Sequence, residues 1–191
     1  MTTFEYLSVF VSIVLGLAVV RLLGGLVAVV TRSGGRPYWV YTAWLSYFVL
    51  WLPYFWWFTL DWREQEVWTF PLFFFVVAYA MLNYVLVVVL VPNPSTETLD
   101  YEAVFFRVRR PFFRLYTVVL LVDMADSILK GPENIAGLGP TYFPLVSALV
   151  LGHIVASMTD SRRYHGAWVS ISFLVFILFS LNVWADVFSS I

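Results

Sequence analysis

The stretch from Trp68 to Val91 reads WTFPLFFFVVAYAMLNYVLVVVLV and holds no charged side chain. Its apolar residues follow one another continuously, without the alternation expected of a barrel strand. At 1.5 Å per residue, a helix of this length covers roughly 36 Å, enough to cross the about 30 Å hydrocarbon core of a bilayer. Only helices and closed barrels satisfy every backbone hydrogen bond in lipid. The stretch therefore predicts a transmembrane helix.

Similar apolar stretches occur along the whole chain. Hydrophobic residues make up 61% of it and charged residues 12%, whereas soluble domains average about 45–50% and about 25%. We therefore predict an all-α integral membrane protein with one transmembrane domain, residues 1–191, built as a bundle of six transmembrane helices. The predicted spans are residues 4–30, 39–60, 68–91, 112–130, 142–158 and 168–188.

The basic residues are distributed unevenly between the two sides of this bundle. Seven arginines fall in the first, third and fifth loops, whereas the loops on the opposite side hold only Arg63 and, at a helix end, Lys130. The positive-inside rule places the basic loops in the cytoplasm and both termini on the non-cytoplasmic side (N-out, C-out) of a cytoplasmic, or inner, membrane. The first, third and fifth loops contain Arg32, Arg36, Arg107, Arg109, Arg110, Arg162 and Arg163.

The third loop contains a segment, residues 100–110, that mixes apolar residues with three arginines. One interpretation is a short amphipathic helix lying on the membrane surface, followed by a helix that Pro111 opens. The other is an ordinary basic loop. In either case Arg107, Arg109 and Arg110 form a candidate cytoplasmic contact surface.

Small residues recur at helical spacing in two of the predicted spans. Ser12, Gly16 and Gly24 belong to a row at intervals of four in the first span, and Gly152 belongs to a shorter row in the fifth. Such rows allow helix backbones to approach closely in lipid. We therefore expect the first and fifth helices to be buried, either within the bundle or between subunits.

Three spans followed by three spans would give halves of opposite topology, so a weak 3+3 inverted repeat is one alternative. Asp61 and Asn83 in the first half are separated by the same interval as Asp160 and Asn182 in the second. Inverted repeats are common in transporters. However, any two bilayer spans produce similar spacings, so this alternative rests on little.

Some polar and ionisable residues fall deep inside predicted spans. A charge at the bilayer centre costs about 3 kcal/mol on insertion scales. We therefore expect Arg21 to pair with Asp123 or Asp126, which would bring the first and fourth helices into contact. The pair is either a structural lock or part of a site that binds an ion or proton. The candidate intramembrane polar site comprises Arg21, Asn83, Asp123, Asp126 and His153.

Motifs for catalysis and cofactor binding are absent from the sequence. It has no cysteine and no HExxH, GxSxG or phosphate-loop motif, so an enzymatic role is disfavoured. Haem or a metal at His153 and His165 is a minor alternative, and we predict no cofactor and no metal. A net charge of −1 argues against nucleic-acid binding.

Two functional hypotheses remain. The first is a channel-like or transporter-like protein in the lipid bilayer, moving an ion, proton or small solute past the Arg/Asp site and acting as a homo-oligomer. The second is a non-enzymatic membrane subunit, sensor, effector or anchor that acts with a soluble cytoplasmic partner through its basic loops. The sequence does not identify the solute or the partner.

Overall fold

The computed structural model describes residues 2–31, 37–91 and 100–189, with side chains described as far as residue 181. Every regular element in these ranges is a helix, which confirms the all-α prediction. The elements are α1 (Thr3–Thr31), α2 (Trp39–Thr59), the 3-10 helix η1 (Leu60–Glu64), α3 (Phe70–Leu90), α4 (Tyr101–Leu129), α5 (Pro132–Leu138), α6 (Tyr142–Met158) and α7 (Arg162–Ser189).

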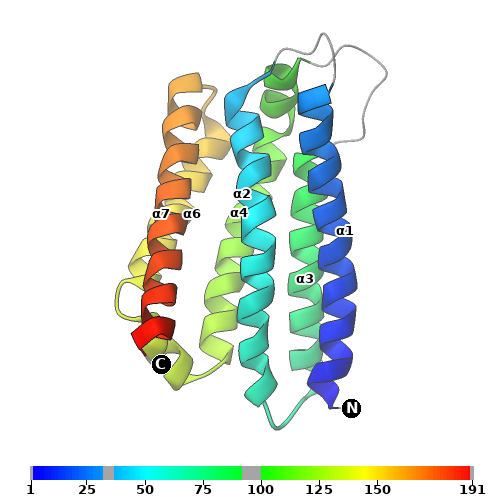
Figure 1. Cartoon of the computed structure of the whole chain (residues 1–191). Helices are drawn as coiled ribbons and strands as arrows, with labels where there is room; N and C mark the ends of the chain where they lie inside the picture. The colour runs from blue at the N-terminus through cyan, green and yellow to red at the C-terminus, as the bar shows by residue number, and fades with distance from the viewer. Residues whose placement is uncertain (1, 32–36, 92–99, 190–191) are drawn as a thin grey trace.

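The long helices stand side by side as an up-and-down bundle, with both termini at the same end (Figure 1). The end with the termini also holds η1 and α5, and we call it the acidic end because it carries Asp61, Glu64 and Glu133. The opposite end is called the basic end. It carries Arg107, Arg110, Arg162 and Arg163.

Several of these helices are long and apolar enough to cross a membrane. Within the described residues they are α1, α3 and Arg162–Leu181 of α7, and a fourth if α5 and α6 count as one bent span. The bend measures 76°. Gly131 and Gly139 flank α5 with φ values of 99° and 76°, a conformation that favours glycine. The predicted spans at residues 39–60 and 112–130, which correspond to α2 and part of α4, stay predictions, as does the orientation in the membrane.

The helices pack around a core of aromatic side chains. α1 packs on α2 and α3, α4 packs on α3 and α6, and α7 packs on α2 and α6. At the centre, Trp44 of α2 contacts Phe112, Phe113 and Tyr116 of α4, and all four are buried. An inverted repeat would require α4 to pack on α7 as α1 packs on α3. Because α4 packs mainly on α6 and α3 instead, the packing does not repeat.

α4 is one continuous helix of 29 residues, so a separate surface helix over residues 100–110 is a wrong prediction. The Asp100 side chain caps its first turn by accepting hydrogen bonds from the backbone N–H groups of Glu102 and Ala103. Val104 and Phe105 are buried in the bundle. The apolar residues of this segment therefore contribute to the protein core, and Pro111 lies inside the helix.

The small-residue row of α1 faces outward in the single chain. A Cβ atom added at Gly16 or Gly24 would meet no atom within 4 Å. Ser12 is exposed and accepts a hydrogen bond of 3.1 Å from Trp56 Nε1. The expected burial of this row within the bundle is therefore wrong, and its burial between subunits stays a prediction. The buried face of α1 consists of Phe4, Leu7, Val11, Leu15, Ala18 and Leu22.

Gly152 and Gly16 provide a matched test of this packing. An ideal Cβ at Gly152 would lie 1.9 Å from Cη2 of Trp168, whereas Gly16 has open space. We expect Gly152→Ala to cost about 1–3 kcal/mol through overpacking and to lower the Tm of the protein in detergent. Gly16→Ala should leave the Tm unchanged or raise it. An equal loss of Tm in both variants would contradict the packing described here.

Candidate functional site

A pocket lies inside the bundle near the acidic end, between α2, α3, α4 and α6. The space inside it that the centre of a water-sized sphere can reach is about 60 Å³. Its walls are largely aromatic and include Trp51, Tyr54, Phe55, Phe58 and Phe179. Its polar lining consists of Thr59, Tyr79, Asp123, Asp126, Ser127, Lys130, Asn134 and Tyr142.

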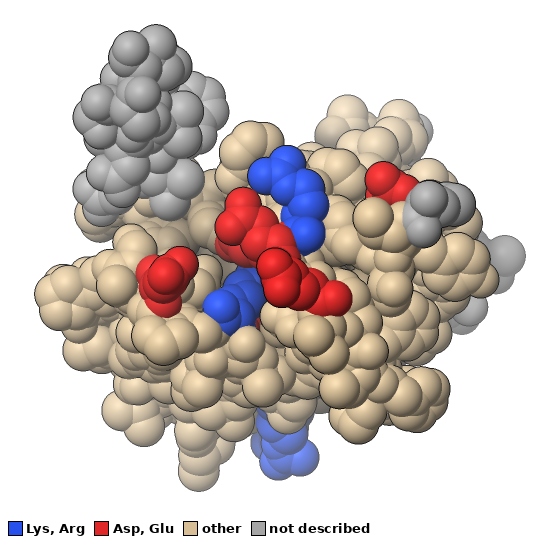
Figure 2. All heavy atoms as spheres, turned by 90° about the horizontal axis from the view of Figure 1, so that it is seen from below, with Lys and Arg blue, Asp and Glu red and all other residues tan. Residues whose placement is uncertain are grey.

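A surface groove at the acidic end adjoins this pocket. Trp62, Lys130 and Asn134 line both the groove and the pocket. Figure 2 views the molecule from this end and shows acidic and basic side chains gathered near its centre. The groove therefore offers a polar route from the surface to the pocket. Its charged lining consists of Asp61, Arg63, Glu64, Lys130 and Glu133.

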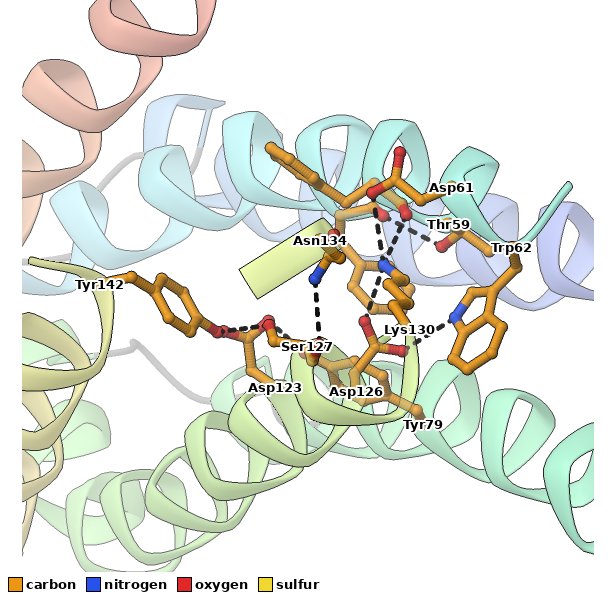
Figure 3. A network of polar contacts seen from close by, with 12 residues as sticks. Thr59, Asp61, Trp62, Tyr79, Asp123, Asp126, Ser127, Lys130, Asn134 and Tyr142 are labelled. Atoms are coloured by element: carbon orange, nitrogen blue, oxygen red, sulfur yellow. Dashed lines mark hydrogen bonds and ion pairs between the residues drawn. The ribbon is translucent and has the colours of Figure 1, made fainter. Parts of the chain in front are cut away.

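Lys130 is the central charge of the site (Figure 3). Its Nζ lies 2.8 Å from Asp126 Oδ2 and 3.6 Å from Asp61 Oδ2, and it donates a 2.8 Å hydrogen bond to the carbonyl oxygen of Phe58. Asp126 and Phe58 lie within hydrogen-bond distance of the ammonium group, and Asp61 adds an ion pair at longer range. The Lys130 side chain is only 6% exposed.

The two carboxylates beside Lys130 lie in different environments. Asp126 is buried, and its Oδ1 accepts a 2.9 Å hydrogen bond from Trp62 Nε1. Asp61 belongs to η1, where its side chain is 45% exposed. Burial raises the pKa of Asp61 above its usual value, and Lys130 offsets only part of that rise.

Asp123 is held by tyrosines. Its Oδ1 accepts a 2.9 Å hydrogen bond from the Tyr79 hydroxyl and its Oδ2 a 2.6 Å bond from the Tyr142 hydroxyl. The Tyr142 oxygen in turn accepts from the Ser127 hydroxyl at 2.9 Å. Among the described residues, no lysine or arginine forms an ion pair with Asp123. Removing an unpaired carboxylate from water is costly. A proton or a bound cation would therefore stabilise the Asp123 side chain in this position.

Asn83 lies on α3, one turn after Tyr79. Its Nδ2 donates to the backbone carbonyl of Tyr79 at 3.1 Å, and its Oδ1 accepts from Trp51 Nε1 at 3.2 Å. Tyr79 therefore links Asn83 to Asp123. Three of the predicted polar residues, Asn83, Asp123 and Asp126, thus lie in or beside one pocket.

Arg21 lies elsewhere, and its predicted pairing with Asp123 or Asp126 is wrong. Its Nε and Nη2 donate hydrogen bonds of 2.9 and 2.7 Å to the carbonyl oxygen of Val91, the C-cap residue of α3. The C-terminus of a helix presents unpaired carbonyls and partial negative charge, which stabilise a cation. α1 and α4 do meet, but through the hydrogen bond from the Tyr101 hydroxyl to the Ala28 carbonyl oxygen.

His153 also lies outside the pocket. It is buried against Trp44, Tyr116 and Trp168, and its Nδ1 donates to the Leu149 carbonyl oxygen at 2.6 Å. In the described part of the chain its Nε2 has no hydrogen-bond partner. His165 hydrogen-bonds the backbone oxygen of Thr159.

The two histidines share an aromatic neighbour. Phe113 contacts both rings, with centroids 5.6 Å from His153 and 5.6 Å from His165. The described contacts therefore place each histidine against Phe113. The predicted absence of haem and metal is not tested by this arrangement.

The predicted basic contact surface divides into buried and exposed members. Arg109 is 2% exposed, forms an ion pair with Asp160 and donates to the Thr159 carbonyl oxygen, so its assignment to a contact surface is wrong. Arg107 and Arg110 are exposed. Arg114, which the sequence interpretation passed over, is exposed on the same face of α4, because positions 107, 110 and 114 follow helical spacing.

Tyr79, Tyr142 and Trp62 are site residues that sequence interpretation missed. Trp62 is 2% exposed and donates a hydrogen bond to Asp126. Tyr79 stands four residues before Asn83, and this spacing on one helix face was the available signal. Tyr142 offered none, because its contact with Asp123 depends on how α6 packs against α4.

The site therefore combines a lysine held by two carboxylates and a backbone carbonyl, a carboxylate hydrogen-bonded to two tyrosines, and aromatic walls. Its mouth opens toward the acidic end. Such a pocket can bind a small ion, proton or solute. Comparison with known protein families, with curated protein sequences and with solved structures finds no match to this chain. The chemistry of the pocket is therefore the basis on which a function can be proposed.

The Lys130–Asp126 pair predicts a specific pattern of stabilities. Lys130→Met leaves the buried Asp126 without its counter-ion and should cost about 3–5 kcal/mol. Asp126→Asn should cost less, because Asp61 and the Phe58 carbonyl still hold Lys130. The double variant should recover part of the Lys130→Met loss. Thermal unfolding in detergent measures all three.

Arg114→Met is the control for these variants, because the side chain is exposed and its loss should leave the Tm unchanged. A double variant no more stable than Lys130→Met alone would show that the lost ion pair is not the source of the destabilisation.

Proposed function

We propose that this chain is a multi-pass membrane protein that binds an ion, proton or small solute in the pocket and carries it across the bilayer. One observation supports this most: a pocket with a charged lining enters the bundle from the acidic end. Asp123 lies near its floor. Beyond it, toward the basic end, Tyr116, Phe113 and Phe112 are buried and packed against α2.

The proposed topology has six spans with the basic end in the cytoplasm. The length of α2, 21 residues, equals that of α3 and corresponds to about 30 Å. Arg107, Arg110, Arg162 and Arg163 of the basic end supply the positive-inside signal. In this orientation the pocket opens to the outside.

A carrier fits the pocket better than an open channel does. A channel needs a continuous path, whereas aromatic side chains fill the bundle beyond Asp123. A carrier exposes one site alternately to each side, and a site closed on one side is one state of that cycle. The exposed row containing Gly16 and Gly24 supports a homo-oligomer by offering close contact to a second copy.

Solid-supported membrane electrophysiology on proteoliposomes tests this proposal. Concentration jumps of H⁺, Na⁺ and methylammonium should evoke a transient current for at least one of them, saturating with concentration. Asp123→Asn should abolish that current, because the variant lacks the carboxylate that calls for a cation. Retained Tm in detergent establishes that the variant is folded.

Arg114→Gln is the matched control, because it removes a charge from α4 outside the pocket and should leave the current intact. Folded protein that gives no current with any of the three cations contradicts the carrier. So does a current that Asp123→Asn leaves unchanged.

A second candidate function is a membrane anchor or subunit that recruits a soluble cytoplasmic partner. Arg107, Arg110 and Arg114 favour it, because they are exposed on one face of α4 and form no ion pair within the described residues. A soluble protein that co-purifies with the wild type and is lost from Arg107→Gln/Arg110→Gln, together with an absence of current, would favour this function over the carrier.

A further inference from the structure

We propose that the pocket recognises a small organic ammonium ion, with the charged nitrogen at Asp123 and the alkyl groups against the aromatic walls. This inference rests on the proposal that the pocket is the binding site of the protein, and it names the chemical class of the ligand. Three features of the pocket support it: the charge balance of its lining, the unused hydrogen-bonding capacity of its charged groups and the aromatic composition of its walls.

The charge balance of the pocket and its mouth is negative. The described lining carries five carboxyl groups and two cations, which are Asp61, Glu64, Asp123, Asp126 and Glu133 against Arg63 and Lys130. Lys130 is matched to Asp126 at 2.8 Å and to Asp61 at 3.6 Å. Asp123 thus remains the carboxyl group for which a ligand cation is the missing partner.

The unused hydrogen-bonding capacity of the charged groups consists of acceptors. A carboxylate has about four lone-pair sites, and the bonds from Tyr79 and Tyr142 use two of those on Asp123. Lys130 already has two carboxylates and a backbone carbonyl around its ammonium group. An anionic ligand would therefore meet a lysine whose charge is already balanced, whereas an N–H donor would find the oxygens of Asp123.

The walls of the pocket suit an organic cation. Trp51, Tyr54, Phe55 and Phe58 line it with aromatic rings, whose faces attract alkylammonium groups. Lys130 already makes such a contact, with its Nζ 5.8 Å from the ring centroid of Trp62. An inorganic cation prefers a shell of oxygen ligands, which aromatic walls do not provide.

An isosteric series separates charge from shape. Purified protein in detergent is titrated with tert-butylammonium, tert-butanol and trimethylacetate, which are close in size and carry charges of +1, 0 and −1. Trp51 and Trp62 line the pocket, so their fluorescence reports its occupation. We expect saturable binding of tert-butylammonium, binding of tert-butanol that is at least tenfold weaker, and no binding of trimethylacetate.

Two variants examine the two halves of the recognition. Asp123→Asn should weaken tert-butylammonium binding at least tenfold, because it removes the negative charge while keeping the size of the side chain. Phe58→Leu should weaken tert-butylammonium binding several-fold and leave tert-butanol binding little changed. Arg114→Gln should bind like the wild type. If Asp123→Asn fails to fold, the ligand series on the wild type and Phe58→Leu still decide the question.

Each contrary result identifies a different error. Equal binding of tert-butylammonium and tert-butanol shows an apolar site without charge recognition, and stronger binding of trimethylacetate reverses the proposed charge preference. A current with H⁺ or Na⁺ but no tert-butylammonium binding overturns the ligand class and leaves the carrier standing. Saturable tert-butylammonium binding without any current overturns the carrier and supports the ligand class.

Discussion

Three cations within the described bundle each donate to the C-terminal end of a helix. Arg21 binds the carbonyl of the C-cap residue of α3, Arg109 that of the C-cap residue of α6, and Lys130 a carbonyl in the last turn of α2. Helix C-termini leave carbonyls unpaired and carry partial negative charge. In an apolar bundle each such contact gives the cation an acceptor and gives the carbonyl at the helix end a donor. The position of each cation is thereby tied to the place where a neighbouring helix ends.

The same constraint makes the two ends of the bundle chemically different. At the basic end the Arg109 guanidinium is buried, paired with Asp160 and packed on the ring of Phe106. At the acidic end Lys130 faces a cavity, and a second carboxylate, Asp123, is left to tyrosine donors. The functional proposals follow from this surplus carboxylate, because a carboxylate in an apolar pocket needs a proton or a cation.

The aromatic content of α2 has a structural role that complements the pocket. Trp44 and Phe48 pack against α4 and block the bundle between the pocket and the basic end. Trp51 and Phe55, one to two turns further along α2, line the pocket instead. One helix therefore supplies both a packed barrier and a wall of the pocket.

The sequence by itself determined the helices, since long apolar runs satisfy their backbone only as helices in lipid, and it determined the local Asp126–Lys130 pair through its spacing of four residues. Residues 142–158 were predicted with the bounds that α6 has. Only the tertiary structure decided that Arg21 binds a backbone carbonyl instead of Asp123, and that Tyr142 completes the site. Both contacts join distant helices, and a backbone acceptor carries no signature in the side-chain pattern.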